Sequence, residues 1–313
     1  MDLGYTIVVD DSEILSALCG ANDRNLRSIE EYLGVTVVTR GNELTVASSD
    51  AETCRKFQIL MDRIVTGHDA ANGIDRIAAI IGNLESDNAA SLTDYFIHIP
   101  NGLRRIYPKS QKQAEMIALL ETKQLTFCLG PAGTGKTYIA VASALSLVLS
   151  RKVRKLVLTR PVVEAGESLG FLPGDLEQKI SPYLRPLYDA MESLVSPETV
   201  RKLEDSRMIE IAPLAYMRGR SLDDCAVILD EAQNTTKEQM KMFLTRLGEG
   251  SRAIITGDPT QVDLPSRAGS GLSHAVRVLA GIPDIGIIAL DNRDVVRSPL
   301  VKKIVQAYEQ QND

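Results

Sequence analysis

From residue 125 onward, short apolar runs alternate with longer amphipathic stretches. The runs are four or five residues long and almost continuously apolar, which is typical of buried strands, and the stretch 136–149 between two of them predicts a helix. Strands that are apolar on both faces and alternate with helices indicate an α/β fold with a parallel sheet covered on both sides. The predicted strands are 125–129, 155–159, 208–212, 226–229, 253–256 and 286–290.

The first 66 residues follow a different pattern. Apolar spacing over 16–33 predicts a helix, a turn and a second helix, which Gly34 ends. Two β-rich runs, 35–38 and 43–46, flank a Gly-Asn turn and predict a hairpin. A further helix is expected from a cap at Ser49 or Asp50 to about Val65. We therefore predict a small α+β domain over residues 1–66.

Residues 67–100 join the two regions. Ala- and Asn-rich stretches surround one amphipathic piece, 74–84, and the segment 103–109 is basic and contains a proline. We predict a helical linker over 67–100 and a second domain over 101–313.

Composition limits the class of protein. Hydrophobic residues make up 44% and charged residues 24% of the 313, which excludes a wholly disordered chain. The sequence has no apolar run of the ~18 residues that a membrane helix needs and no signal-peptide pattern at its start, so we expect a cytoplasmic protein without a membrane partner. The four cysteines are widely separated, which argues against a disulfide framework.

Charge is unevenly distributed. Residues 1–98 hold 7 basic and 16 acidic side chains, whereas residues 99–313 hold 28 and 25. Any nucleic acid would therefore be bound more favourably by the second region.

A glycine-rich motif follows the first predicted strand and precedes the helix 136–149. It matches the pattern G-x-x-x-x-G-K-[ST], in which backbone N–H groups and the helix N-terminus surround phosphates. Lys136 is expected to reach the β- and γ-phosphates, and the Thr137 hydroxyl to ligate Mg²⁺. The predicted phosphate-binding residues are Gly130, Pro131, Ala132, Gly133, Thr134, Gly135, Lys136 and Thr137.

Two further motifs follow predicted strands. Asp230 and Glu231 come directly after an apolar run, at the edge of the sheet where α/β proteins bind ligands. Asp230 is expected to hold Mg²⁺ through water, and Glu231 to polarise the attacking water. The run 254–261 ends in Gly-Asp-Pro-Thr-Gln, so Gln261 could sense the γ-phosphate, although Gly-Asp-Pro is also a good turn.

These motifs carry a resemblance to known families. Asp-Glu-Ala-Gln followed by Gly-Asp-Pro-Thr-Gln resembles the first motor lobe of superfamily 1 helicases. Longer runs resemble the PhoH-like ATPase family, from about Pro100 to the C-terminus. These runs are 159–167, 170–175, 213–220 and 238–246.

The resemblance implies a single RecA-like P-loop ATPase lobe that uses ATP and Mg²⁺ in RNA metabolism. It also implies a homo-oligomer, with a hexamer as one candidate, and an endoribonuclease of ribosomal RNA maturation as partner. By the same resemblance, Gln113 matches the position where superfamily 1 enzymes read adenine, although a solvated helical glutamine is the alternative.

Several arginines are candidates for contacts with charged groups. Arg160, Arg218 and Arg220 could contact RNA phosphates, and solvated surface is the alternative for each. Arg297 is the first choice for an arginine finger, presented to a neighbouring subunit, and Arg293 the second. A salt bridge near a helix start is the alternative for Arg297.

The N-terminal domain resembles a KH domain. The segment 20–23 lies between two predicted helices, where a working KH loop reads Gly-x-x-Gly and clamps the RNA backbone. Asp23 stands at the fourth position and the domain is acidic. We expect a KH-like fold whose loop does not clamp RNA.

The sequence therefore favours an RNA-linked, Mg²⁺-dependent ATPase. Two other functions stay open, a P-loop kinase of a small molecule and an ATP-switched adaptor of a ribonuclease. With only one Walker motif in the chain, any unwinding requires an oligomer.

Overall fold

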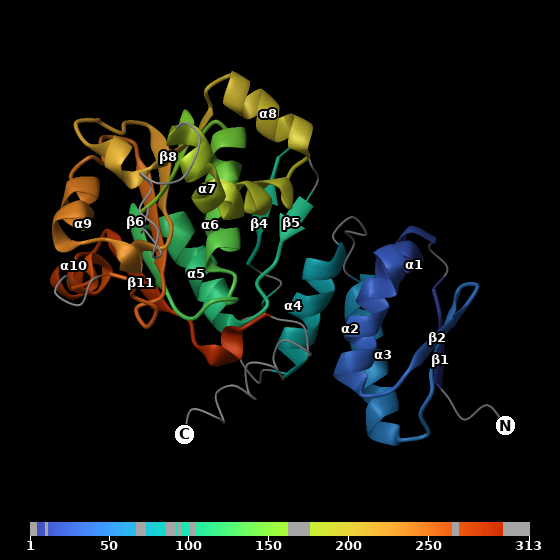
Figure 1. Cartoon of the computed structure of the whole chain (residues 1–313). Coiled ribbons are helices and arrows are strands. Elements are labelled where there is room, and N and C mark those ends of the chain that lie inside the picture. The colour runs from blue at the N-terminus through green and yellow to red at the C-terminus, as the bar shows by residue number, and fades with distance from the viewer. Residues whose placement is uncertain are drawn as a thin grey trace. The chain divides into compact units, whose positions relative to one another are not determined.

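The computed structural model describes residues 5–9, 12–66, 73–85, 92, 95–100, 104–161, 176–264 and 269–296. It divides into two compact units, Met1–Ala114 and Glu115–Asp313 (Figure 1). Each unit is described by itself.

The first unit contains a three-stranded antiparallel sheet and helices that cover it. The strand order is β1-β3-β2, with β1 and β2 both pairing with β3. The hairpin predicted at 35–46 is confirmed as β2 and β3, whereas β1 was not predicted. The elements are β1 (Tyr5–Val8), α1 (Ser12–Cys19), η1 (Ala21–Asp23), α2 (Arg24–Leu33), β2 (Val37–Arg40), β3 (Glu43–Val46) and α3 (Ala51–Thr66).

Helix α4 (Gly73–Glu85) belongs to the core of this unit. Its Ile77 and Ile80 are buried in one hydrophobic cluster with Leu26 and Phe57. The helix at 74–84 was predicted, but as part of a linker; its apolar face instead packs against α2 and α3. A short antiparallel pair, β4 (Ile97–Ile99) and β5 (Arg104–Ile106), follows and was not predicted.

The turn at 20–23 keeps an unusual backbone. Gly20, Asn22 and Asp23 have φ angles of 68°, 53° and 56°, in the left-handed region that glycine adopts most easily. Asp23 therefore has the backbone conformation of a glycine at the position where a KH loop has its second glycine. That this loop does not clamp RNA stays a prediction.

The second unit is an α/β domain with a six-stranded parallel sheet, in the order β11-β6-β10-β9-β7-β8. All six predicted strands are confirmed to within one residue at each end. The strands are β6 (Leu125–Leu129), β7 (Lys155–Arg160), β8 (Ile209–Pro213), β9 (Cys225–Leu229), β10 (Arg252–Gly257) and β11 (Ile285–Ala289).

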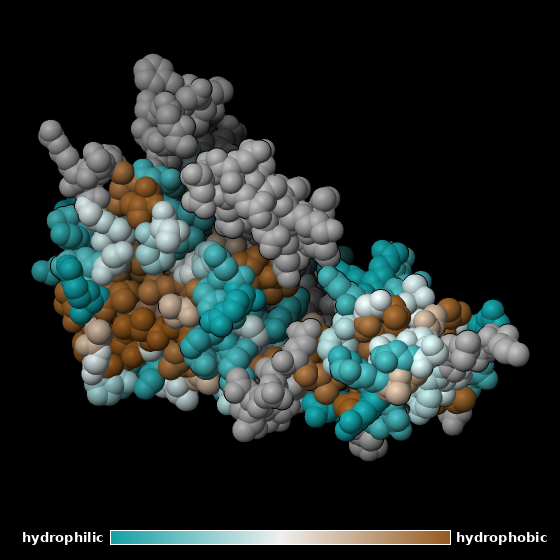
Figure 2. All heavy atoms as spheres, turned by 90° about the horizontal axis from the view of Figure 1, so that it is seen from below, coloured by the Kyte–Doolittle hydropathy of each residue, from teal (hydrophilic) through white to brown (hydrophobic). Residues whose placement is uncertain are grey.

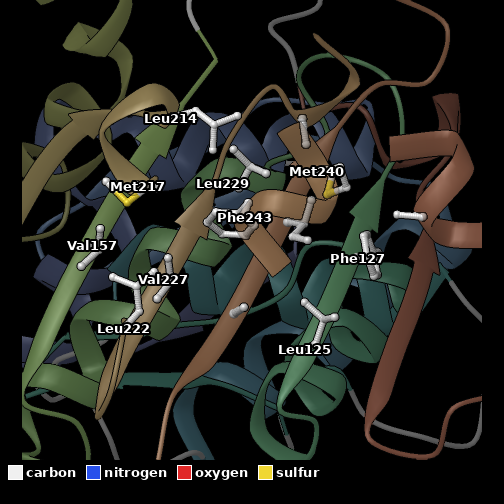
Figure 3. Close-up of a cluster of buried hydrophobic side chains, with 14 of the residues drawn as sticks. Leu125, Phe127, Val157, Leu214, Met217, Leu222, Val227, Leu229, Met240 and Phe243 are labelled. Atoms are coloured by element: carbon white, nitrogen blue, oxygen red, sulfur yellow. The ribbon is translucent and has the colours of Figure 1, made fainter. Parts of the chain in front are cut away.

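Helices cover both faces of this sheet. Helix α6 packs against β7, β9 and β10 on one face. On the other, Phe127, Val227 and Leu229 form a buried cluster with Met240 and Phe243 of α9 (Figure 3). Alternate residues of each strand thus enter different layers, as the continuous apolar runs require. Helix α5 (Gln111–Thr122) includes the boundary between the two units, and the helices that follow it are α6 (Lys136–Leu149), α7 (Leu176–Glu192), α8 (Pro197–Asp205), α9 (Lys237–Leu244) and α10 (Gly271–Leu279).

The surface of the second unit includes exposed hydrophobic side chains. Val278 and Ile282, at and after the end of α10, are 60% and 43% exposed. On the face that is visible in Figure 2, hydrophobic residues of this unit gather into a patch. Among the described residues, no helix is long and apolar enough to span a membrane.

Candidate nucleotide-binding site

The phosphate loop joins β6 to α6 and has the backbone that its glycines permit. Gly130, Gly133 and Gly135 have φ angles of 139°, 84° and 79°. A Cβ atom on Gly130 would lie 2.5 Å from the carbonyl oxygen of Leu290, so no larger residue fits there without a backbone shift. The loop therefore wraps tightly and ends at the N-terminus of α6, where backbone N–H groups attract anions.

Lys136, the first residue of α6, lies folded into this loop. Its Nζ donates to the carbonyl oxygens of Gly130 and Pro131, both at 2.7 Å, and to Thr134 Oγ1 at 3.3 Å. Burial lowers the pKa of Lys136, while the carboxylates of Asp258, Glu231 and Asp230 act to raise it. The ammonium group is thus held inside the loop that would surround a phosphate.

Thr137 and Asp230 meet across the sheet edge. Thr137 Oγ1 donates to Asp230 Oδ1 at 2.8 Å, and the buried Thr256 hydroxyl donates to the same oxygen. A hydroxyl and a carboxylate provide the hard oxygen ligands that Mg²⁺ prefers. In nucleotide sites, Mg²⁺ usually combines one or two such protein ligands with oxygens of the substrate phosphates. No group of three or more potential metal-ligating side chains occurs among the described residues. These two residues fit a magnesium ion that shares its coordination with phosphates.

Glu231 follows Asp230 in a strained backbone conformation. Its φ and ψ are 52° and 38°, which costs a non-glycine residue about 1–3 kcal/mol. Its Oε1 lies 3.2 Å from Arg160 Nη2, and its Oε2 accepts a hydrogen bond from Gln233 Nε2. Two side chains thus hold the carboxylate that was expected to polarise water.

Strand β10 lies between β6 and β9 in the sheet. The segment that follows it, which begins at Asp258, therefore lies between the phosphate loop after β6 and the acidic pair after β9. Gln233 Oε1 accepts the backbone N–H of Asp258 at 3.0 Å, which ties the end of β10 to the segment after β9. Asp258 is 5% exposed; its Oδ1 accepts two hydrogen bonds from Thr260. Its Oδ2 is buried without a hydrogen-bond partner among the described residues.

Residues of all three motifs line one pocket of about 270 Å³. Lys136, Thr137, Asp230, Glu231 and Gln261 come from three separate motifs, and the fold brings them together. The remaining lining residues are Ala132, Gly133, Gly135, Tyr138, Gly257 and Asp258.

Gln113 and the second candidate for the arginine finger, Arg293, are not among the described residues that line this pocket. Gln113 belongs to the first unit, is 4% exposed, and accepts the Lys109 N–H through Oε1 at 2.7 Å. Its adenine-reading role stays a prediction.

The first candidate for the arginine finger, Arg297, lies outside the described residues. The residue before it is close to the phosphate loop, because Val296 N–H donates to Gly133 O at 2.9 Å. Arg293 is exposed and paired with Asp291.

The three arginines proposed for RNA contact have different surroundings. Arg218 is exposed and directly follows a short 3-10 helix, Leu214–Met217. Arg160 is paired with Glu231, and Arg220 makes two hydrogen bonds to Glu210. Glu210 also accepts a hydrogen bond from Lys155. Arg220 thus has a structural partner that the sequence pattern did not reveal.

The Glu210 cluster predicts a specific pH dependence of stability. Hydrogen bonds from Arg220 and Lys155 lower the pKa of Glu210 to about 2. A lowered folded-state pKa stabilises the protein above the unfolded value of about 4.3, and this contribution disappears as the pH falls through about 2. Because the side chains are partly exposed, we expect Glu210→Gln to cost roughly 1 kcal/mol at neutral pH and less near pH 2.

Chemical denaturation at a series of pH values measures this difference. Asp189→Asn is the matched control, because it removes an exposed ion pair with Arg185 on α7. A destabilisation by Glu210→Gln that is independent of pH between neutral pH and pH 2 would contradict the assignment.

Gln233 and Thr256 are site residues to which no role was assigned from sequence. Both are buried, and each donates to an acidic residue of the pocket. Gln233 belongs to the Asp-Glu-Ala-Gln motif, so the sequence did point to it. Thr256 is the last residue of the predicted strand 253–256, where a polar side chain indicates only that the apolar run is ending. Their contacts depend on β9 and β10 being neighbours.

Comparison with known proteins identifies the family of this chain. The PhoH-like protein family matches residues 105–309. A PhoH-like protein of Bacillus subtilis (strain 168) is 47% identical over 305 residues, which are 95% of this chain and 94% of that protein. One of Synechocystis sp. (strain PCC 6803) is 42% identical over 314 residues, 97% and 94% of the two chains. One of Mycobacterium tuberculosis (strain H37Rv) is 44% identical over 301 residues, 95% and 85% of the two.

Two solved helicase structures show a weak similarity. The Hef helicase domain of Pyrococcus furiosus has a TM-score of 0.33 at 17% identity, covering 58% of this chain and 38% of that one. The Pif1 helicase of Candida albicans has a TM-score of 0.33 at 14% identity, covering 62% and 42%. These values are too low to support a functional conclusion, whereas the family match covers more than half of the chain. The chain belongs to the PhoH-like protein family and carries that family's P-loop nucleotide-binding domain.

Proposed function

We propose that this protein hydrolyses ATP with Mg²⁺ and that RNA is the ligand to which hydrolysis responds. The observation that carries the proposal is the convergence of Lys136, Thr137, Asp230 and Glu231 on one pocket. A cation, a magnesium-binding pair and a carboxylate for water are the parts that phosphoryl transfer to water requires.

Each residue has a distinct task in this proposal. The backbone of 130–135 and Lys136 bind the phosphates, and Thr137 with Asp230 would hold Mg²⁺. When bound, the ion neutralises charge on the β- and γ-phosphate oxygens. Glu231 orients the attacking water, and Gln261, in the Gly-Asp-Pro-Thr-Gln motif after β10, contacts the γ-phosphate. Gln113 is proposed to read the adenine edge, because an amide can both donate to and accept from it.

RNA, further copies of this chain and a ribonuclease are the proposed partners. Partly buried Arg160 at the end of β7 and exposed Arg218, which follows the short helix after the neighbouring strand β8, support an RNA contact at the carboxyl edge of the sheet. A homo-oligomer, with Arg297 completing a neighbouring site, follows from the single P-loop lobe. The endoribonuclease of ribosomal RNA maturation remains a proposed partner from the family resemblance alone.

Phosphate release without any acceptor tests this function. The full chain is incubated with ATP and Mg²⁺, with and without single-stranded RNA, and its mass is measured by light scattering. We expect release in water alone, a higher rate with RNA, and a mass above that of one chain.

The other outcomes identify the alternatives. Release only after addition of a metabolite, with transfer of phosphate to it, would favour a small-molecule kinase. Single-turnover hydrolysis at the rate of free ATP would favour an ATP-switched adaptor of a ribonuclease. A monomer with full activity would contradict a finger supplied by another subunit.

A further inference from the structure

Arg160 connects the candidate catalytic carboxylate to another part of the fold. It is the last residue of β7, and its guanidinium contacts two groups. Nη2 lies 3.2 Å from Glu231 Oε1, and Nη1 donates to the carbonyl oxygen of Tyr183 on α7 at 3.1 Å. Arg160 thus bridges helix α7 and the pocket.

This contact fixes the direction of the Glu231 carboxylate. One oxygen is paired with Arg160 and the other accepts from Gln233. A residue that orients water must aim a carboxylate oxygen at that water within hydrogen-bond distance. Glu231 lines the pocket, and in the present arrangement both of its carboxylate oxygens have protein partners.

The surroundings of Arg160 are suited to a single-stranded nucleic acid. Arg160 is in register with Pro213, the last residue of β8, and the short 3-10 helix η4 (Leu214–Met217) follows directly. This helix carries Tyr216, which is 51% exposed, and the exposed Arg218 follows its last residue. An exposed aromatic ring with adjacent arginines is the arrangement on which bases stack and phosphates bind.

We propose that Arg160 is a positioning residue through which an RNA phosphate controls Glu231. The inference rests on the proposed ATPase function and specifies its regulation. Without RNA, Arg160 holds Glu231 away from the attacking water. An RNA strand stacked on Tyr216 and bound by Arg218 presents a phosphate to Arg160, which exchanges one anion for the other and releases Glu231.

The chemistry of arginine supports such an exchange. A guanidinium has five N–H donors in a planar fork that fits phosphate as well as carboxylate, and it stays charged throughout. The Arg160 and Glu231 side chains are 20% and 38% exposed, so their ion pair is partly solvated and only modestly favourable. A phosphate held in place by neighbouring contacts can therefore compete for Arg160.

Steady-state ATPase assays on Arg160→Gln test the proposal, with a short oligouridine as the RNA probe. The wild-type chain should have a low basal rate that the oligouridine raises. In the variant, Glu231 is no longer held, so the basal rate should rise about two- to fivefold and no longer respond to the oligouridine. Arg160→Lys should restore the low basal rate, because an ammonium group can still pair with Glu231.

Arg185→Gln is the matched control, because it removes an exposed arginine from α7, the helix that Arg160 contacts, and Arg185 does not line the pocket. It should keep both the basal and the stimulated rate. Tyr216→Ala should shift the oligouridine dependence of the rate to higher concentration, because a base then loses the ring on which it stacks.

Two results would overturn the inference. One is a basal rate for Arg160→Gln at or below that of the wild type, which would give Arg160 a purely structural or directly catalytic role. The other is an undiminished stimulation by the oligouridine in that variant. Failure of the proposed ATPase function is seen separately, as a wild-type chain that releases no phosphate or a Glu231→Gln variant as active as the wild type.

Discussion

Lys136→Ala is expected to abolish tight ATP binding. The lysine is the one cationic side chain lining the described pocket, and its Nζ lies among the carbonyl oxygens of the phosphate loop. A hydrogen bond between charged groups contributes about 1.5–3 kcal/mol, so its loss should weaken ATP binding by about 10- to 150-fold. Loss of a cation that faces the transferring phosphoryl group should further lower kcat by roughly 10²–10³-fold. Calorimetric titration with a non-hydrolysable ATP analogue measures the first effect.

Lys202→Ala is the matched control, since Lys202 is an exposed lysine on α8. It should bind ATP as the wild type does. The melting temperature of Lys136→Ala without nucleotide shows whether the variant is folded. A folded variant with wild-type ATP affinity would contradict the assignment of Lys136 to the phosphates.

Glu231→Gln should retain ATP binding and stop turnover. The amide is nearly the same size as the carboxylate and leaves the phosphate loop intact, so nucleotide affinity should change little. It cannot accept a proton from water, and a positioned general base contributes typically 10²–10⁴-fold to the rate. A fall of that size in kcat, with analogue affinity retained, is the expected result in phosphate-release and binding assays.

Glu238→Gln provides the comparison, because Glu238 is an exposed glutamate in the first turn of α9, close in sequence to Glu231. Its kcat should match that of the wild type. Unchanged turnover in Glu231→Gln would remove its assignment as the water-orienting residue. A parallel loss of analogue binding would instead show that Glu231 holds the nucleotide.

The sheet of the second unit was predictable because each strand carries its own signal. Strands such as 125–129 and 253–256 are buried on both faces, so they appear as continuous apolar runs whatever their neighbours are. The first unit was less predictable. Strand β1 has the burial of an edge strand, mostly exposed, and lacks such a run. Strands β4 and β5 have three residues each, too few for a period to appear.

The packing of α4 marks a second limit of sequence reasoning. Its amphipathic pattern predicts a helix with an apolar face, but the pattern does not say what that face covers. In the structure, Ile77 and Ile80 join the core of the first unit. Whether a helix belongs to a linker or to a core depends on long-range contacts, which local periodicity does not encode.

Sequence alone determined the identity of the phosphate loop, the acidic pair Asp230 and Glu231, and the strands that carry them. These are local features: a glycine pattern dictates a backbone, and an apolar run dictates a strand. Only the tertiary structure decided which side chains hold these groups. The order β6-β10-β9 places Thr256 on Asp230, and the pairing of β7 with β9 brings Arg160 to Glu231. Strand order and register are set by the burial of the whole sheet, so the partners of Glu231 and of Arg220 could be found only in the folded chain.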